Sequence, residues 1–171
     1  MIQCFLHSIA LPIGKFLLVE SEGFLCAMTT ESELPFLHKQ LQRHISETLI
    51  FVSTTTPLLQ QAEQQLAEYF RSQRRIFDLP IRLYGSEFQQ RVWQQLLQIP
   101  YGCTTNYGSI ANQLHQKGSR AVGTAVGKNP LPIIVPCHRV LPADGSLGNF
   151  SMYGGSATKA FLLDLEGVSY K

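Results

Sequence analysis

The sequence predicts two small domains: an α/β domain over residues 1–84, then a mostly α-helical, winged-helix-like domain with a helix-turn-helix over residues 85–171. The length of 171 residues fits one larger domain or two small ones. Glycine usage changes near residue 84, since two of the 13 glycines precede it and eleven follow it. The charge changes too, from seven Lys/Arg against eight Asp/Glu to seven against four. We therefore expect the second, glycine-rich and basic part to approach a ligand with its backbone.

Residues 1–84 alternate between strand-like and helix-like patterns. The predicted elements are strands at 16–19 and 24–27 joined as a hairpin, a helix at 34–45, a strand at 49–52 and a helix from 57 to 70. Leu34, Leu37 and Leu41 recur at helical spacing in the first helix. Thr56 followed by Pro57 is a typical start for the second, because proline fits the first helical position. This alternation indicates an α/β domain.

Residues 85–171 are dominated by helical patterns. The predicted elements are helices at 86–99, 107–114, 119–127 and 156–166, with a strand-like run at 133–140. Ser86 and Gln89 form a capping box at the start of the first helix. The second and third helices are separated only by a tight turn at Lys117–Gly118. Helix, tight turn and helix together predict a helix-turn-helix.

The bulk composition is that of an ordinary globular protein, with 44% hydrophobic and 15% charged residues. The net charge of +2 does not by itself indicate a nucleic-acid partner. No apolar run approaches the roughly 20 residues that span a bilayer, and no secretory signal is visible, so we expect no membrane association. The four cysteines form no C-x-x-C pair. We expect free thiols in an intracellular protein, cytoplasmic if bacterial or nuclear if eukaryotic.

Cys137 and His138 are the first candidates for chemistry. A cysteine attacks as its thiolate, which a nearby imidazole or positive charge favours, and Arg139 adds such a charge. Pro136 precedes the pair, which indicates irregular backbone there. The alternative interpretation of the pair alone is a buried structural cysteine beside a surface histidine.

Glu166 is the second candidate, because it lies at the end of the last predicted helix, with Gly167 as the natural C-cap. A carboxylate is disfavoured there by the negative end of the helix dipole. Another group should hold it in place, and a histidine that needs an orienting acceptor is suitable. The alternative is a solvated surface glutamate.

Several further motifs accompany this segment in a fixed order. They are Ile99–Gly102, Tyr107–Gly108, Arg120–Gly123, Asn129–Pro130, the PCHRV run at 136–140, Gly148–Asn149, Lys159, Leu162–Leu163 and Glu166–Gly167. Together they make residues 88–168 resemble the O6-alkylguanine-DNA alkyltransferases, also called methylated-DNA–protein-cysteine methyltransferases. Residues 1–84 resemble the small α/β domain of that family more weakly, through Pro12–Gly14 and the hairpin that follows.

The resemblance implies repair of double-stranded DNA that contains O6-alkylguanine, with base flipping and one irreversible alkyl transfer to Cys137 per molecule. It implies that His138 acts through a water as the base for Cys137 and that Glu166 orients His138. Tyr107 would hydrogen-bond the flipped guanine. The alternative for Tyr107 is a core position on a short helix.

For DNA binding, the resemblance implies that Arg120 fills the gap left by the extruded base while its helix enters the minor groove. Ser119, Ala121 and Thr124 belong to the same DNA-facing segment, and Lys128, like Lys117, is expected to contact phosphate. The alternative for Arg120 is a phosphate contact or a surface charge. Asn129 would support the cysteine loop through backbone hydrogen bonds.

The substrate pocket implied by the resemblance includes the residues after the cysteine. They are Arg139, Val140, Asn149, Phe150 and Ser151, with backbone carbonyls of Cys137 and Val140 facing the guanine amino group and Ser151 donating near O6. Phe150 stands where the family often has tyrosine. The loop at 150–159 is about two residues longer than usual, and the turn at 116–118 about one shorter.

We expect no cofactor, no metal and a monomer. Structural zinc needs about four Cys/His ligands, and the spacing of Cys4, His7, Cys26 and His38 does not fit such a site. Three other functions remain open at this point: a DNA-binding damage sensor without transfer, a cysteine hydrolase using Cys137 and His138, and a transcriptional winged-helix module. The first usually lacks the cysteine, the second usually takes its histidine from a distant segment, and the third makes no use of Cys137.

Overall fold

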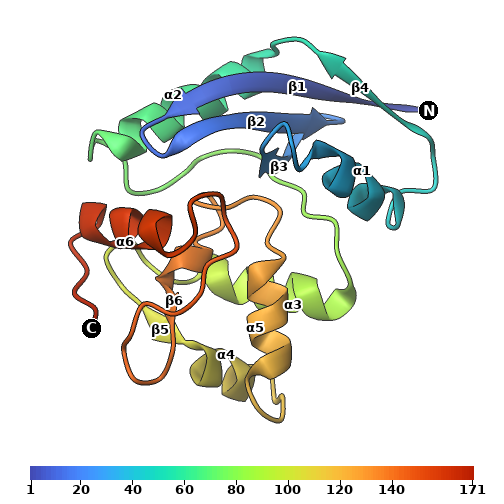
Figure 1. Ribbon diagram of the computed structural model, residues 1–171. Helices are drawn as coiled ribbons and strands as arrows, with labels where there is room; N and C mark the ends of the chain where they lie inside the picture. Colours follow the sequence, from blue (N-terminus) through green and yellow to red (C-terminus); the bar gives the residue numbers. More distant parts are fainter. The chain divides into compact units, whose positions relative to one another are not determined.

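The computed structural model describes residues 1–171 as two compact units, Met1–Gly85 and Ser86–Lys171 (Figure 1). This boundary lies one residue beyond the predicted one. The first unit contains a four-stranded sheet made of β1 (Ile2–Leu11), β2 (Gly14–Ser21), β3 (Phe24–Thr29) and β4 (Leu49–Ser53). The strand order is β3-β2-β1-β4, in which β4 runs parallel to β1 and the other neighbours are antiparallel. The unit is therefore a mixed-sheet α/β domain.

Two helices complete the first unit, α1 (Leu34–Gln42) and α2 (Pro57–Phe70). Leu37 and Leu41 of α1 pack in one core cluster with residues of all four strands. The side chain of Thr56 accepts a hydrogen bond from the backbone N–H of Leu59 at 3.1 Å, so it caps α2 as predicted. The predicted hairpin, β4 and both helices are confirmed.

The ten-residue strand β1 was not among the predicted elements, although it is central in the sheet (Figure 1). Its sequence IQCFLHSIAL lacks a clean alternation of polar and apolar residues. Pro12 and Gly14, which contribute to the weak resemblance of this domain to the family, follow the strand. They lie where the chain turns from β1 into β2, whose Gly14 pairs with Leu11.

The second unit is mostly helical, as predicted. Its elements are α3 (Glu87–Leu97), β5 (Thr105–Asn106), α4 (Tyr107–Gln113), α5 (Arg120–Gly127), a 3-10 helix (Cys137–Arg139), β6 (Val140–Leu141) and α6 (Gly155–Leu165). Ser86 and Gln89 form the predicted capping box at α3. Helices α4 and α5 pack against each other as the helix-turn-helix. No helix in the protein is long and apolar enough to cross a membrane.

Helix α5 is held closely by its neighbours because its residues are small. The indole N–H of the buried Trp93 on α3 donates to the carbonyl of Ala125 at 2.9 Å. A methyl group added at Gly123 would lie 3.8 Å from the ring of Tyr107, so the backbone of α5 runs close beside this tyrosine. The small residues of α5 thus allow close packing within the unit.

The prediction of a strand at 133–140 was wrong. Only Val140 and Leu141 form a strand, which pairs with Thr105 and Asn106, and the preceding residues form a turn and a 3-10 helix. Pro132 and Pro136 lack the N–H groups that a strand needs, and Ile133 has a φ of 73°. The chain folds back on itself instead, with the N–H of Val135 donating to the carbonyl of Leu131.

Candidate active site

Cys137 begins the 3-10 helix and lines a pocket of about 550 Å³ with only 5% of its surface exposed. The pocket lies within the second unit. Its lining residues are Tyr107, Ser119, Arg120, Gly123, Thr124, Val126, Gly127, Cys137, Pro142, Gly148, Asn149, Phe150 and Ser151. The pocket thus places the cysteine beside α5, the second helix of the helix-turn-helix, along most of its length.

Eight of the predicted site residues line this pocket, and others do not. Arg139 and Val140, expected in the pocket, lie in the interior: Val140 pairs with Thr105, and Arg139 faces Glu166. Ala121 is exposed on α5, and Lys128 caps the end of that helix. Ser151 is on the pocket wall, but its hydroxyl donates to the carbonyl of Gly127 at 2.6 Å rather than being free to face a ligand.

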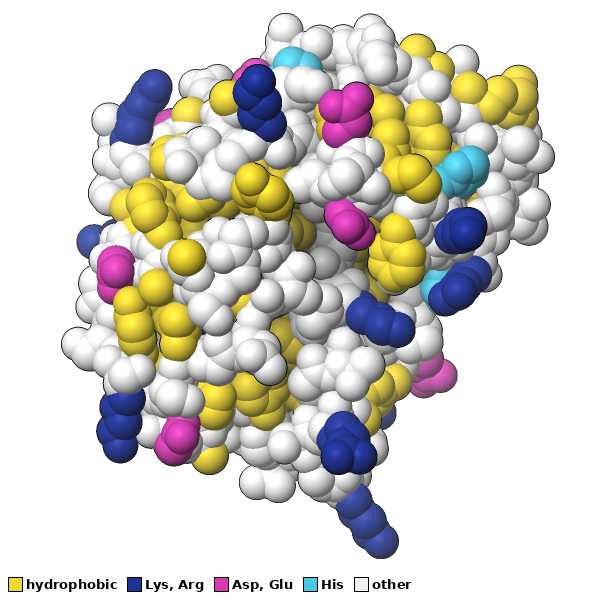
Figure 2. All heavy atoms as spheres, in the orientation of Figure 1, with side chains coloured by type: hydrophobic (Ala, Val, Ile, Leu, Met, Phe, Trp, Pro, Cys, Tyr) yellow, Lys and Arg dark blue, Asp and Glu magenta, His cyan; other side chains and the backbone are white.

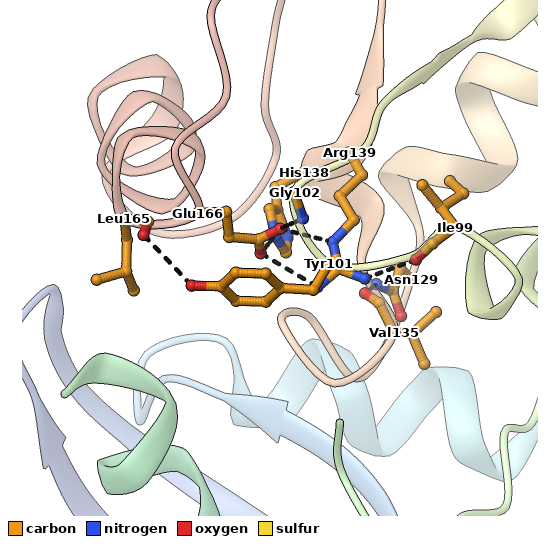
Figure 3. A network of polar contacts seen from close by, with 9 residues as sticks. All are labelled: Ile99, Tyr101, Gly102, Asn129, Val135, His138, Arg139, Leu165 and Glu166. Atoms are coloured by element: carbon orange, nitrogen blue, oxygen red, sulfur yellow. Dashed lines mark hydrogen bonds and ion pairs between the residues drawn. The ribbon is translucent and has the colours of Figure 1, made fainter. Parts of the chain in front are cut away.

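Glu166 is the centre of a buried polar network (Figure 3). One of its oxygens, Oε2, lies 2.5 Å from Nε2 of His138. The guanidinium of Arg139 donates to both oxygens, at 2.9 and 3.2 Å, and the N–H of Gly102 donates to Oε1 at 3.0 Å. This answers the question raised by a carboxylate at a helix C-terminus, because His138, Arg139 and Gly102 hold it in place.

Arg139 has a different position from the one expected beside the cysteine. Besides Glu166, it donates from Nη1 to the carbonyl of Ile99 at 2.7 Å, and its guanidinium lies 5.8 Å from the ring centre of Tyr101. Tyr101 in turn donates its hydroxyl proton to the carbonyl of Leu165. Arg139 therefore neutralises Glu166 and connects the segment after α3 to the 3-10 helix (Figure 3).

The surroundings of the network fix the protonation of His138. Burial alone raises the pKa of Glu166, but hydrogen bonds from His138, Arg139 and the backbone of Gly102 lower it overall, so Glu166 is ionised. Burial lowers the pKa of His138 despite the opposing effect of Glu166, so the imidazole is neutral near pH 7. A carboxylate only accepts hydrogen bonds, so the ring proton is on Nε2. The buried Nδ1, which has no hydrogen-bond partner, is therefore the ring nitrogen that is able to accept a proton.

The thiol of Cys137 needs such a base. Burial raises the pKa of this thiol to about 11, while a hydrogen bond from the Asn129 side chain and the charge of Lys159 act in the opposite direction. The thiol is therefore protonated at neutral pH, and its attack requires a group that accepts the proton.

Asn129 connects the end of α5 to the cysteine loop. Its side-chain N–H donates to the carbonyl of Val135 at 2.8 Å, and its side-chain oxygen accepts from the N–H of Leu131 at 3.0 Å. These are backbone hydrogen bonds of the kind expected of this residue. They hold the turn that replaces a strand before Cys137.

Tyr107 is the first residue of α4, which the side chain of Asn106 caps at the N–H of Ser109. Burial, and to a smaller extent the charge of Cys137, raises the pKa of Tyr107. Its hydroxyl thus remains protonated at neutral pH and can donate into the pocket that it lines. Lys159, noted in the sequence only as part of a motif, is fully buried close to this pocket.

The residues considered for zinc do not converge. His7 contacts Glu63 and Thr55, His38 stacks edge-on against Phe51, and Cys4 and Cys26 are free thiols. No group of three or more His, Cys, Asp or Glu side chains is arranged to hold a metal ion.

The pocket beside the helix-turn-helix contains a cysteine, and the residue after this cysteine is a buried histidine paired with a glutamate. These features together define a class, the DNA-binding proteins that use a cysteine in chemistry. Comparisons with known proteins give the particular family. Residues 5–83 match the 6-O-methylguanine DNA methyltransferase, ribonuclease-like domain, and residues 87–168 match the 6-O-methylguanine DNA methyltransferase, DNA binding domain. The chain belongs to the O6-methylguanine DNA methyltransferase family, the DNA repair enzymes known as methylated-DNA–protein-cysteine methyltransferases.

Individual relatives support this over nearly the whole chain. The constitutive methylated-DNA–protein-cysteine methyltransferase of Bacillus subtilis is 40% identical over 163 residues, covering 94% of this chain and 93% of the relative. The Mycobacterium tuberculosis enzyme is 51% identical over 106 residues, covering 61% of this chain and 63% of the relative. The crystal structure of Mycobacterium tuberculosis OGT in complex with DNA superposes with a TM-score of 0.77 at 38% identity, covering 95% of this chain and 92% of that one.

Proposed function

We propose that Cys137 is the residue that accepts the alkyl group, that the substrate is O6-alkylguanine in duplex DNA, and that each molecule reacts once. The observation that carries this assignment is the position of Cys137 in the pocket, next in sequence to the buried, neutral His138. The other three cysteines lack this setting, since Cys4 and Cys26 are buried in the first unit and Cys103 is exposed.

The reaction follows from the protonation states. Nδ1 of His138, through a water molecule, takes the proton of the Cys137 thiol, and Glu166 stabilises the resulting imidazolium. The sulfur attacks the alkyl carbon, the carbon–O6 bond breaks, and its electron pair goes to the guanine. Tyr107 donates its hydroxyl proton towards the leaving base. The product is a thioether at Cys137, which none of these groups reverses, so one molecule of protein repairs one lesion.

Access to Cys137 requires the base to leave the duplex, because a cysteine that is 5% exposed cannot reach O6 of a stacked guanine. Arg120, the first residue of α5, lines the pocket and is exposed. We propose that it occupies the position vacated by the base. On the face drawn in Figure 2, several Lys and Arg side chains lie near one another at the right edge, and others stand apart. Because the net charge of the chain is only +2, we propose that the pocket and α5 contribute more to recognition than bulk charge does. This substrate and the free thiols fit an intracellular protein.

The Arg120→Ala variant tests base extrusion. We expect transfer from O6-methylguanine to slow by roughly 10- to 100-fold in a duplex, because the few kcal/mol needed to unstack the base are no longer offset. In a single-stranded oligonucleotide the same variant should lose much less. Single-turnover rates on both substrates give this ratio. Lys128→Ala is the comparison. Loss of one phosphate contact should weaken binding to any duplex, and it should lower the slope of the logarithm of the binding constant against the logarithm of the salt concentration by about 1. Equal loss on both substrates in Arg120→Ala would contradict the assignment.

The acceptor assignment is tested with a duplex that carries one O6-methylguanine labelled on the methyl group. We expect label on the protein to stop near one methyl per chain, in the tryptic peptide 129–139, while Cys103→Ser reacts like the wild type. Binding without transfer, with the thiols confirmed as reduced, would make the protein a damage sensor. Release of labelled methanol with turnover would make it a hydrolase. Label in another peptide would place the acceptor elsewhere.

A further inference from the structure

Lys159 on α6 is in an unusual state for a lysine. Its side chain is fully buried, and its Nζ has no hydrogen-bond partner. Buried ammonium groups are normally paired with a carboxylate, because loss of hydration is costly. Glu166, about two helical turns further along the chain, is already held by His138 and Arg139. The unpaired charge therefore costs the fold stability, which suggests that it serves another purpose.

The position of Lys159 suggests what that purpose is. A methyl group added at Gly148 would lie 4.0 Å from Nζ, and the ring centre of Phe150 lies 5.9 Å from it. Gly148 and Phe150 both line the pocket that contains Cys137. In addition, α6 packs against the 3-10 helix that Cys137 begins. The ammonium is thus located beside two residues that line the pocket of Cys137.

We propose that Lys159 is a positioning residue for the reaction, whose buried and unpaired positive charge stabilises the thiolate of Cys137 and so promotes its attack. Its functional meaning rests on the proposed role of Cys137 as acceptor. The attraction is strong for one charge because the site is shielded from water. Since His138 is neutral at rest, Lys159 supplies the standing positive charge while His138 takes the proton.

The pH dependence of this effect has a definite sign. Burial lowers the pKa of Lys159 to about 8, which the charge of Cys137 partly opposes. Lys159 is therefore charged below pH 8 and loses its charge above it, so its help to the thiolate is present at neutral pH and fades in alkali. The other ionisable groups around the pocket and the network are Tyr107 of α4, Arg120 of α5, His138 and Arg139 of the 3-10 helix, and Glu166 after α6. These groups are the same in the wild type and in a variant of Lys159, so the effects of their titration largely cancel when the two reaction rates are divided.

The test compares wild type with Lys159→Met, which keeps the length of the side chain and removes its charge. The readout is the rate of alkylation of peptide 129–139 by iodoacetamide, a small neutral reagent, measured without DNA from pH 6.5 to 10. We expect the variant to react about 3- to 10-fold more slowly at pH 7, since a higher thiol pKa is partly offset by greater intrinsic nucleophilicity. The difference should shrink above pH 8. Lys159→Arg should retain part of the wild-type rate at pH 7.

Thermal unfolding separates this role from a structural one. We expect Lys159→Met to unfold at a higher temperature than the wild type, because an unpaired buried charge is replaced by a buried thioether. Lys171→Met, at an exposed position of the same unit, should change neither readout. A ratio of wild-type to Lys159→Met alkylation rates near one at every pH would overturn the proposal. So would a Lys159→Met variant that is less stable than the wild type and slower by the same factor at every pH. If instead the wild type transfers no methyl group from DNA, the proposed function fails while the iodoacetamide profile still decides the role of Lys159.

Discussion

Replacing Cys137 by serine is expected to lower methyl transfer from O6-methylguanine by at least about 1,000-fold, the kind of loss seen when a nucleophile is removed from an active site. A hydroxyl at this position cannot be deprotonated by a neutral imidazole as readily as a thiol, and oxygen is the poorer nucleophile towards an alkyl carbon. Single-turnover transfer of labelled methyl to the protein measures the effect. Binding to the same duplex should stay within a few-fold of wild type, because the proposed DNA contacts are on α5 and the change of one atom lies within the pocket.

The control for this variant is Cys103→Ser, which removes an exposed thiol from the same unit. It should leave both transfer and binding unchanged. If Cys137→Ser still accepts methyl groups at the wild-type rate, the acceptor is another residue and the pocket has a different use.

Replacing Glu166 by glutamine is expected to destabilise the protein by roughly 3–5 kcal/mol, the usual cost of removing one partner from a buried ion pair. The change leaves the guanidinium of Arg139 buried without a counter-charge and weakens the orientation of His138. Transfer should slow by on the order of 100-fold, since general-base assistance depends on that orientation. Urea unfolding at pH 7 and single-turnover transfer in the folded variant measure the two effects.

The matched control is Asp164→Asn, the same acid-to-amide change on α6 at an exposed carboxylate that accepts a hydrogen bond from Tyr170. It should cost less than about 1 kcal/mol, because exposed pairs contribute little. The effect of Glu166→Gln should also depend on pH. The pKa of Glu166 is lowered in the folded protein, so its stabilising contribution is complete above the unfolded value of about 4.3 and is lost as pH falls towards the folded value. The difference between wild type and Glu166→Gln should therefore shrink at pH 3. An equal difference at pH 3 and pH 7 would show that the charge of Glu166 does not matter.

Local signals in the sequence predicted local structure well. Thr56 before Pro57 and the capping box at Ser86 marked the starts of α2 and α3, because a helix start is satisfied by side chains within one turn. The irregular segment before Cys137 was mistaken for a strand, because its apolar run has the composition of a buried strand. Pro132 and Pro136 lie in this run, and they exclude the regular hydrogen bonding of a strand because they lack N–H groups.

The sequence motifs predicted the residues of the site, but they did not predict all of the contacts between them. Cys137, His138 and Glu166 were identified, and the structure brings His138 and Glu166 together. The position of Arg139 depends on a carboxylate 27 residues away and on the carbonyl of Ile99, contacts that no local pattern encodes. The burial of Lys159 could not be predicted from the sequence either, since a lysine in a helix is normally exposed.

Trp93 gives this protein a built-in optical reporter. It is the sole tryptophan of the chain, it is 1% exposed, and its indole N–H is bound to the backbone of α5. Tryptophan fluorescence from the protein therefore comes from one position, attached to the helix that bears Arg120. Any displacement of α5 when a damaged duplex arrives changes the environment of that indole directly. The motion of α5 can thus be followed in real time in the unlabelled wild-type chain.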